Sequence, residues 1–362
     1  MTKDRKKWWL IPAVIAFLIY IFVTAQSIPE ETILIPRWIS SLESNFPVNL
    51  REFSPDMEKA PIPFILGRRY GYLGEDGRFL INQLRNNYVS ISENLWAEYE
   101  NMPSSIQVMN VKNEAAFTIE DVKGYPFFRE NRAFIIGNEQ NSLSAIGPGG
   151  EELWTHDFPA PITCIDTTQD FVLVGTLDGT VELLNFSGSP VFTPFEPGGS
   201  RLSVILGCAI SRDASRLAII SGVDEQRFLL LERSGSNYRI IYHEFLGVGF
   251  RRDVQISFVD NDHKVAFERQ GGLGIYDINS RTSTNLPLKG EVLILDDSGE
   301  DRFLYVISSQ GPTEKRFISI RYPASIIIDV PFRSENVFFV RRDSNLFLGG
   351  DLSIASFEIG RK

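Results

Sequence analysis

Hydrophobic residues in this chain gather in short runs that are separated by turns carrying Gly or Asp. The clearest example is FVLVGTLDGTVELLNF, residues 171–186, where one apolar run reaches an Asp-Gly turn and a second apolar run follows. Further copies of this phrase begin at Tyr70, Ala133, Leu217, Val265, Phe303 and Leu346. From Ala133 onward the copies are 38 to 48 residues apart, and a period in this range indicates an array of repeated structural units.

Each repeat contains two more apolar runs, so four short strands are expected in every unit. The first two runs are almost continuously apolar, which fits strands buried on both faces, whereas the outer runs alternate more. Seven copies of such a unit predict an all-β fold, a seven-bladed β-propeller of four-stranded blades over residues 64–362.

The last predicted blade lacks an outer strand. The chain stops soon after IASFEIG, residues 354–360, which has the position of a third strand. Because closing a ring of blades removes exposed sheet edges, a segment before residue 64 is expected to supply the missing strand. Residues 26–63 are rich in proline and are predicted to be a linker, within which ETILIPRWI, residues 31–39, is the candidate ring-closing strand.

The amino terminus carries a candidate membrane segment. Residues 8–25, WWLIPAVIAFLIYIFVTA, contain no charge, and as a helix they would extend about 27 Å, enough to cross a hydrocarbon core. Basic residues precede this segment, so we predict a cytoplasmic stub over residues 1–7, a transmembrane signal-anchor helix over residues 8–25 and a periplasmic domain after it. This places the chain in the inner membrane as a single-pass protein. A cleaved secretory signal is the alternative, and it also exports the domain.

The charge balance argues against nucleic acid as a partner. The formal net charge is −10, and since the first seven residues carry +3, the remainder carries −13. An acidic body repels phosphate backbones on average. Cysteine is scarce, with only Cys164 and Cys208, so no disulfide framework is expected. Two buried thiols are predicted, and a bridge between neighbouring blades is the alternative.

Three segments resemble known propeller repeats. VGTLDGTVELLNFSGSPVF, residues 174–192, resembles the repeat of pyrroloquinoline-quinone-type propellers, and GPGGEELWTHDF, residues 147–158, resembles the outer half of that repeat, with Trp154 in the usual aromatic place. SRDASRLAIISG, residues 211–222, resembles the phrase of WD-like and TolB-like propellers. The resemblance implies a non-catalytic exported propeller that acts as a scaffold in envelope assembly. The quinone-dependent enzymes of this class use adjacent cysteines, which this chain lacks, so no cofactor is expected.

The residues that usually carry chemistry are scattered. The three histidines, His156, His243 and His263, lie in separate repeats, so no metal site is predicted. Two acidic turns, residues 259–263 and 296–301, carry oxygen ligands of the kind that calcium prefers, but they lack the spacing of a dedicated loop. Turns select Asp, Asn and Gly for backbone reasons alone. No Ser-His-Asp arrangement or phosphate-binding glycine loop occurs, so no catalytic residue is predicted.

Arginine pairs occur in the predicted turns between first and second strands. If all these turns open on one side of the ring, the arginines of the first, second and seventh predicted blades form a basic sector, opposite an acidic sector made by the turns of the fifth and sixth. Clustered guanidinium groups recognise carboxylates and phosphates, so this sector is predicted to bind an anionic partner. The residues are Arg68, Arg69, Arg129, Arg132, Arg341 and Arg342. The alternative is that charged residues simply occupy solvated turns.

Together these patterns predict a membrane-anchored, extracytoplasmic β-propeller that acts as a non-enzymatic protein-binding scaffold at the cell envelope. The partner is expected to be an envelope protein, with the membrane contacted through residues 8–25. A glycan-active lyase or hydrolase with a site at the propeller channel is the alternative function, because loops at one end of a rigid ring can assemble an active site.

Overall fold

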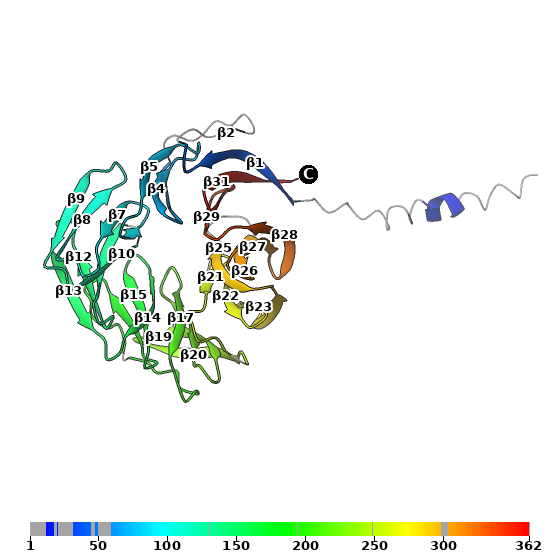
Figure 1. The fold of residues 1–362 in the computed structure, drawn as a ribbon. Coiled ribbons are helices and arrows are strands. Elements are labelled where there is room, and N and C mark those ends of the chain that lie inside the picture. Colours follow the sequence, from blue (N-terminus) through cyan, green and yellow to red (C-terminus); the bar gives the residue numbers. More distant parts are fainter. Residues whose placement is uncertain are drawn as a thin grey trace, which may run out of the picture. The chain divides into compact units, whose positions relative to one another are not determined.

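Short antiparallel strands make up almost all of the chain that the structure describes (Figure 1). The structure is a computed structural model and describes residues 12–17, 20, 32–44, 48–49, 59–129, 131–192, 194–247, 249–297 and 303–361. The chain divides into two units, a large one over residues 36–358 and a small one that joins residues 1–35 to residues 359–362. Apart from residues 32–35 of the first strand and residues 359–361 of the last, the sheets described below lie in the large unit.

The described strands form eight sheets, numbered here as blades 1 to 8. Blade 1 contains β3 (Ile62–Leu66), β4 (Arg69–Leu73) and β5 (Phe79–Leu84), and blade 2 contains β6 (Tyr88–Ile91), β7 (Leu95–Tyr99), β8 (Ser105–Asn110) and β9 (Ala115–Glu120). Blade 3 contains β10 (Gly124–Arg129), β11 (Arg132–Gly137), β12 (Ser142–Ile146) and β13 (Glu152–Asp157). Blade 4 contains β14 (Ile162–Thr167), β15 (Phe171–Thr176) and β16 (Val181–Asn185).

The second half of the chain forms the other four blades. Blade 5 contains β17 (Ile205–Ile210), β18 (Arg216–Ser221), β19 (Arg227–Ser234) and β20 (Asn237–Phe245), and blade 6 contains β21 (Ile256–Val259), β22 (Lys264–Arg269), β23 (Gly272–Asp277) and β24 (Thr282–Pro287). Blade 7 contains β25 (Glu291–Asp296), β26 (Phe303–Ser309), β27 (Glu314–Arg321) and β28 (Ser325–Arg333). Blade 8 contains β29 (Val337–Arg342), β30 (Asn345–Gly350) and β31 (Ser353–Arg361), together with β1 (Thr32–Ser41) and β2 (Val48–Asn49) from the amino-terminal part of the chain. The repeat copies from Ala133 onward mark the second strands of their blades, because β11, β15, β18, β22, β26 and β30 each begin at the predicted position or one residue before it.

The predicted number of blades is wrong, because the ring has eight blades rather than seven. The sequence pattern missed blade 2, whose second strand begins at Leu95, between the repeat copies at Tyr70 and Ala133. The turn that follows this strand, residues 100–104, has the sequence ENMPS and carries neither Gly nor Asp. Without the turn signal, two blades in this region counted as one irregular repeat.

Blade 1 runs in the opposite direction to its neighbours. At the end of β29 the side chain of Arg342 donates to the carbonyl of Ala60, which precedes β3. At the other end, Gly67 follows β3 and lies beside Asn336, which precedes β29. The inner strand β3 is therefore antiparallel to β29. Consequently the β3–β4 turn opens on the opposite side of the ring from the first turns of the other blades.

An amino-terminal strand closes the ring in blade 8. β1 lies between β2 and β31, in the position for which the missing outer strand predicted a partner. Trp38 of β1 is fully buried, and its indole nitrogen donates to the carbonyl of Glu75 in blade 1 at 2.7 Å. The hydroxyl of Ser40 donates to the carbonyl of Gly77 at 2.6 Å. One strand therefore completes blade 8 and also fastens it to blade 1.

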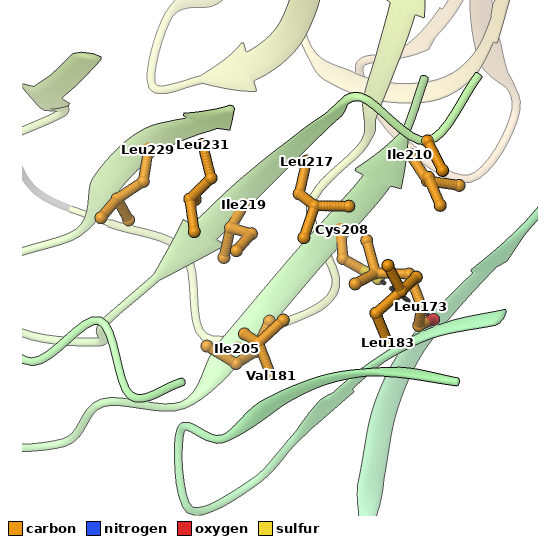
Figure 2. Close-up of a cluster of buried hydrophobic side chains, with 11 residues drawn as sticks. Leu173, Val181, Leu183, Ile205, Cys208, Ile210, Leu217, Ile219, Leu229 and Leu231 are labelled. Atoms are coloured by element: carbon orange, nitrogen blue, oxygen red, sulfur yellow. Dashed lines mark hydrogen bonds between the residues drawn. The ribbon is translucent and has the colours of Figure 1, made fainter. Parts of the chain in front are cut away.

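Apolar side chains between blades form the core. Figure 2 shows the cluster between blades 4 and 5, in which side chains from both sheets point toward one another. The buried members are Leu173, Val181, Leu183, Ile205, Cys208, Ile210, Ala214, Leu217, Ile219, Leu229 and Leu231. Since burying one Leu or Ile side chain contributes about 1.5–3 kcal/mol, clusters of this size make each blade depend on its neighbours.

The transmembrane helix expected over residues 8–25 is not found. Residues 12–17 and 20 are helical, and no helix in the described part of the chain is long and apolar enough to cross a membrane. Residues 8–11, 18–19 and 21–25, like the predicted cytoplasmic stub over residues 1–7, lie outside the described residues.

Candidate functional site

Most of the first turns of the blades lie on one side of the ring, where they are joined by hydrogen bonds from blade to blade. We call this side the inner-turn face; it holds the β6–β7, β10–β11, β14–β15, β17–β18, β21–β22, β25–β26 and β29–β30 turns. A carboxylate oxygen of Asp166 in blade 4 accepts the backbone N–H of Ile210 in blade 5 at 2.9 Å. Asp262 in blade 6 likewise accepts the backbone N–H of Arg212 in blade 5 at 2.9 Å.

The same pattern continues through blades 7 and 8. The carboxylate of Asp297 accepts the backbone N–H of Asp260, and that of Asp296 accepts the backbone N–H of Arg341 at 3.1 Å. The predicted acidic sector therefore consists largely of side chains that fasten one blade to the next. Glu300 and Asp301, the other acidic residues of the segment 296–301, lie outside the described residues.

The contact made by Asp297 can be tested through the pH dependence of the free energy of unfolding. Burial raises the pKa of Asp297 to about 6 from its ordinary value of 3.8. Between these two values the folded protein binds a proton that the unfolded chain has released, so the free energy of unfolding falls as the pH rises from about 4 to about 6. Asp297→Asn should remove this part of the pH dependence, as measured by urea unfolding at several pH values.

The exposed Asp170→Asn is the matched control for Asp297→Asn, and it should leave the pH dependence as it is in the unaltered protein. A stability difference between the Asp297→Asn variant and the unaltered protein that stays constant across this pH range would contradict the assignment.

Two of the predicted arginines meet in the β10–β11 turn of the inner-turn face. The guanidinium of Arg132 donates to the carbonyl of Thr168 in blade 4 and lies 5.4 Å from the ring centroid of Phe134. Arg129 forms a loose ion pair with Asp166, with 3.8 Å between nitrogen and oxygen, and 56% of its side chain is exposed. This turn therefore presents positive charge beside the junction of blades 3 and 4.

The other four predicted arginines do not join this pair. Arg341 is only 4% exposed and lies over the ring of Tyr305, while Arg342 beside it donates to the carbonyls of Ala60 and Pro61. Because blade 1 is reversed, Arg68 and Arg69 lie on the opposite face, where Arg68 is exposed. The structure thus separates the six residues into three turns, and their role in partner binding stays a prediction.

An apolar pocket of about 280 Å³ lies next to the Arg129–Arg132 turn. Its walls come from the outer strand of blade 2, from blade 3 and from blade 4, and Arg132 is the one charged residue among them. The lining residues are Phe117, Asn131, Arg132, Ala133, Phe134, Ala145, Ile146, Gly147, Pro148, Leu153, Trp154, Val172 and Phe186. This cavity combines an apolar interior with a cation on the inner-turn face.

Trp154 forms the wall of the pocket between blades 3 and 4. Its indole nitrogen donates to the carbonyl of Phe186 at 2.8 Å, and Gly188, with a φ of +75°, approaches its ring so closely that a Cβ there would lie 2.5 Å away. The resemblance to quinone-type repeats predicted an aromatic residue at Trp154. The pocket itself was not predicted, because it joins residues from three blades. The only signal for it was two apolar residues, Leu153 and Phe186, whose side chains the structure places half-exposed at the rim.

Two larger depressions lie elsewhere, with volumes of about 670 and 680 Å³ and mixed polar linings. Two of their charged groups have structural partners: Asp351 accepts the backbone N–H of Glu335 at 2.9 Å, and Lys315 donates to the carbonyl of Pro312 at 2.7 Å. In the described part of the chain, no three His, Cys, Asp or Glu side chains lie where they could share a metal ion. His156 pairs with Glu182 at 3.0 Å.

The two cysteines are free thiols in the neighbouring inner strands β14 and β17. Cys208 is buried in the cluster of Figure 2, and Cys164 is half-buried against it. A hydrogen bond with Cys164, together with burial, raises the pKa of the Cys208 thiol. Since the thiolate is the reactive form, Cys208 is held in its unreactive state.

Eight radially arranged antiparallel sheets, closed by a strand from the other end of the chain, define an eight-bladed β-propeller. All 362 residues match the family described as beta-propeller protein, and the chain belongs to this family. An uncharacterized protein of Treponema pallidum (strain Nichols) is 24% identical over 361 residues, which cover 99% of this chain and 95% of that protein.

Solved structures with a similar fold include proteins of different kinds. BamB from Moraxella catarrhalis has a TM-score of 0.58 at 10% identity, covering 90% of this chain and 100% of that one. The computationally designed Ika8 protein has a TM-score of 0.60 at 13% identity, covering 84% and 98%. The dihydro-heme d1 dehydrogenase NirN, in complex with DHE, has a TM-score of 0.53 at 11% identity, covering 71% and 58%. At these identities the likeness concerns the fold alone.

Proposed function

We propose that this propeller is a protein-binding scaffold without chemistry of its own, and that it works outside the cytoplasm. The observation that carries the proposal is the apolar pocket beside Arg129 and Arg132, with the half-exposed Leu153 and Phe186 at its rim. Exposed apolar residues around a concave site are typical of surfaces that bind other proteins. The fold likeness to BamB and the repeat-level resemblance to non-catalytic exported propellers support the same function.

Photocrosslinking in cells that naturally express the chain tests the scaffold. A benzophenone amino acid at Phe186 or Leu153 reports on the inner-turn face, and the same group at Leu177 or Leu352 reports on the opposite face. We expect both positions of one face to capture the same protein, identified by mass spectrometry. Absence of any captured protein from all four positions would refute the scaffold.

The extracytoplasmic location rests on the basic and then apolar amino-terminal sequence. Alkaline phosphatase fused to the carboxyl terminus is active only outside the cytoplasm, so the fusion should be active in cells. An inactive fusion, together with a matching cytoplasmic reporter that is active, would place the propeller in the cytoplasm. The outcome for the location is independent of the crosslinking result.

A further inference from the structure

The pocket between blades 3 and 4 has a size and a charge that together indicate one kind of occupant. We propose that it is the docking site for a single aromatic side chain of a partner protein, presented on an extended segment that carries a carboxylate beside the aromatic residue. The proposal rests on the scaffold function and names the chemistry of its partner.

The volume of the pocket suits a single side chain. At about 280 Å³ it lies close to the lower limit of the range of about 300–1,000 Å³ that is usual for small-molecule sites. One large aromatic side chain buries about 150–250 Å² and is the most common anchor at the centre of a protein interface. The walls suit such an anchor, because the rings of Phe134 and Trp154, which lie 6.4 Å apart in a tilted arrangement, both line the cavity.

The charge around the pocket selects an anionic neighbour for the aromatic residue. Arg132 lines the pocket and Arg129 lies in the same turn, whereas no acidic residue lines the cavity. The ion pair of Arg129 with Asp166 is long, and more than half of the Arg129 side chain faces solvent. A carboxylate of the partner at this mouth would gain a charge-assisted hydrogen bond, whereas a cationic residue there would be repelled.

The rim of the pocket is open to solvent. After β16 the chain turns back along it, and Phe195 exchanges two backbone hydrogen bonds with Val181, so the edge of blade 4 is already occupied and a partner has only the rim to cover. Phe186 follows β16 and remains 61% exposed, and Leu153 across the pocket remains 49% exposed. A segment that lies over this rim would cover both side chains and insert its aromatic residue between them.

Binding of short peptides to the full chain tests the proposal. The protein is labelled with 5-fluorotryptophan, and its Trp154 resonance is assigned with the variant Trp154→Phe. The probe is the peptide acetyl-Gly-Trp-Asp-Gly-amide, compared with peptides in which Lys replaces Asp or Ala replaces Trp. We expect the first peptide to shift the Trp154 signal in a saturable way, the Lys peptide to bind about tenfold more weakly, and the Ala peptide not to bind.

Variants separate the parts of the site. Phe186→Ser and Leu153→Ser should each weaken binding about fivefold or more, and Arg129→Gln should remove most of the preference for Asp over Lys. Leu352→Ser, which alters an equally exposed leucine on the opposite face, is the matched control and should change nothing. Thermal unfolding of each variant shows that the fold is kept.

Three results would overturn the proposal: no shift of the Trp154 signal with any peptide, equal binding of the Asp and Lys peptides, or tighter binding of free indole-3-acetate than of the Asp peptide. The last result would identify a small-molecule site. If crosslinks arise from Leu177 and Leu352 while the peptides fail to bind, the docking proposal falls and the scaffold stands. If neither experiment gives a signal, both fall.

Discussion

Replacement of Trp38 by alanine is expected to lower the free energy of unfolding by about 3–5 kcal/mol, the usual cost of truncating a buried tryptophan. The side chain is fully buried, its ring centroid lies 6.0 Å from that of Phe347 in blade 8, and its indole N–H donates to the carbonyl of Glu75 in blade 1. The substitution therefore removes contacts on both sides of the ring closure at once. Urea unfolding measures the loss, and hydrogen exchange should show the largest loss of protection in β31 and β4.

Two further variants identify the cause of the effect. Trp38→Phe keeps an aromatic ring but removes the hydrogen bond, so it should cost less than the alanine variant. Ile39→Ala alters the next residue of the same strand, which is 40% exposed, and should cost clearly less than either. A loss below about 1 kcal/mol for Trp38→Ala would show that β1 does not hold the ring closed.

Replacement of Glu268 by alanine is expected to cost about 3 kcal/mol, the lower end of the range for breaking a buried ion pair, because Arg252 is a third exposed and keeps its contact with Glu291 at 3.1 Å. Glu268 in β22 is only 1% exposed, and its two oxygens accept from Arg252 at 2.9 and 2.7 Å. One of these oxygens also accepts the backbone N–H of Val292 in blade 7 at 2.9 Å. One carboxylate thus joins blades 6 and 7 to the segment that precedes β21.

A double-mutant cycle with Arg252→Ala separates the pair from the rest of the site. The double variant should be more stable than the two separate losses would predict, since removing both charges leaves neither unpaired. Glu268→Gln should lie between the unaltered protein and Glu268→Ala, because the amide oxygen still accepts one hydrogen bond. Additive losses in the cycle would mean that the ion pair is not the source of the effect.

The sequence pattern predicted most of the fold because propeller blades repeat a local signal. From β14 onward each blade has an apolar inner strand and a turn that requires Gly or Asp, and the predicted strands match the observed ones. The signal fails in blade 2, where residues 100–104 form the turn without either residue, whereas the copy at Tyr70 correctly marks β4 of blade 1, which has three described strands. A short blade beside a blade without its turn signal looks like one repeat of irregular length.

The predicted binding face failed to assemble for a related reason. A single basic face requires every first turn to open on the same side, which holds only if every blade runs in the same direction. β1 and β2 add two strands before β3, so β3 enters the ring reversed and carries Arg68 to the opposite face. The direction of a blade depends on how strands from the two ends of the chain pair, and a local repeat does not contain that information.

The candidate site could be predicted from the sequence only in part, for a different reason. Arg129 and Arg132 were singled out as a charged pair, and Trp154 as an aromatic position of the repeat. Their convergence on one pocket depends on packing between blades, which brings Phe117 and Phe186 to the same cavity from positions far apart in the sequence. Arg341 was predicted to belong to the basic sector, but its side chain is buried although it lies in a turn.

The pairing of β1 with β31 also sets the order of events during synthesis on the ribosome. β1 is synthesised before its partner β31, so one edge of β1 remains unpaired until β31 has emerged. Unpaired strand edges promote aggregation. Arg37, which pairs with Glu358 in the closed ring, places a charge on β1 while its edge is unpaired. A prematurely terminated chain would leave Trp38 uncovered, so burial of this one indole distinguishes complete molecules from incomplete ones.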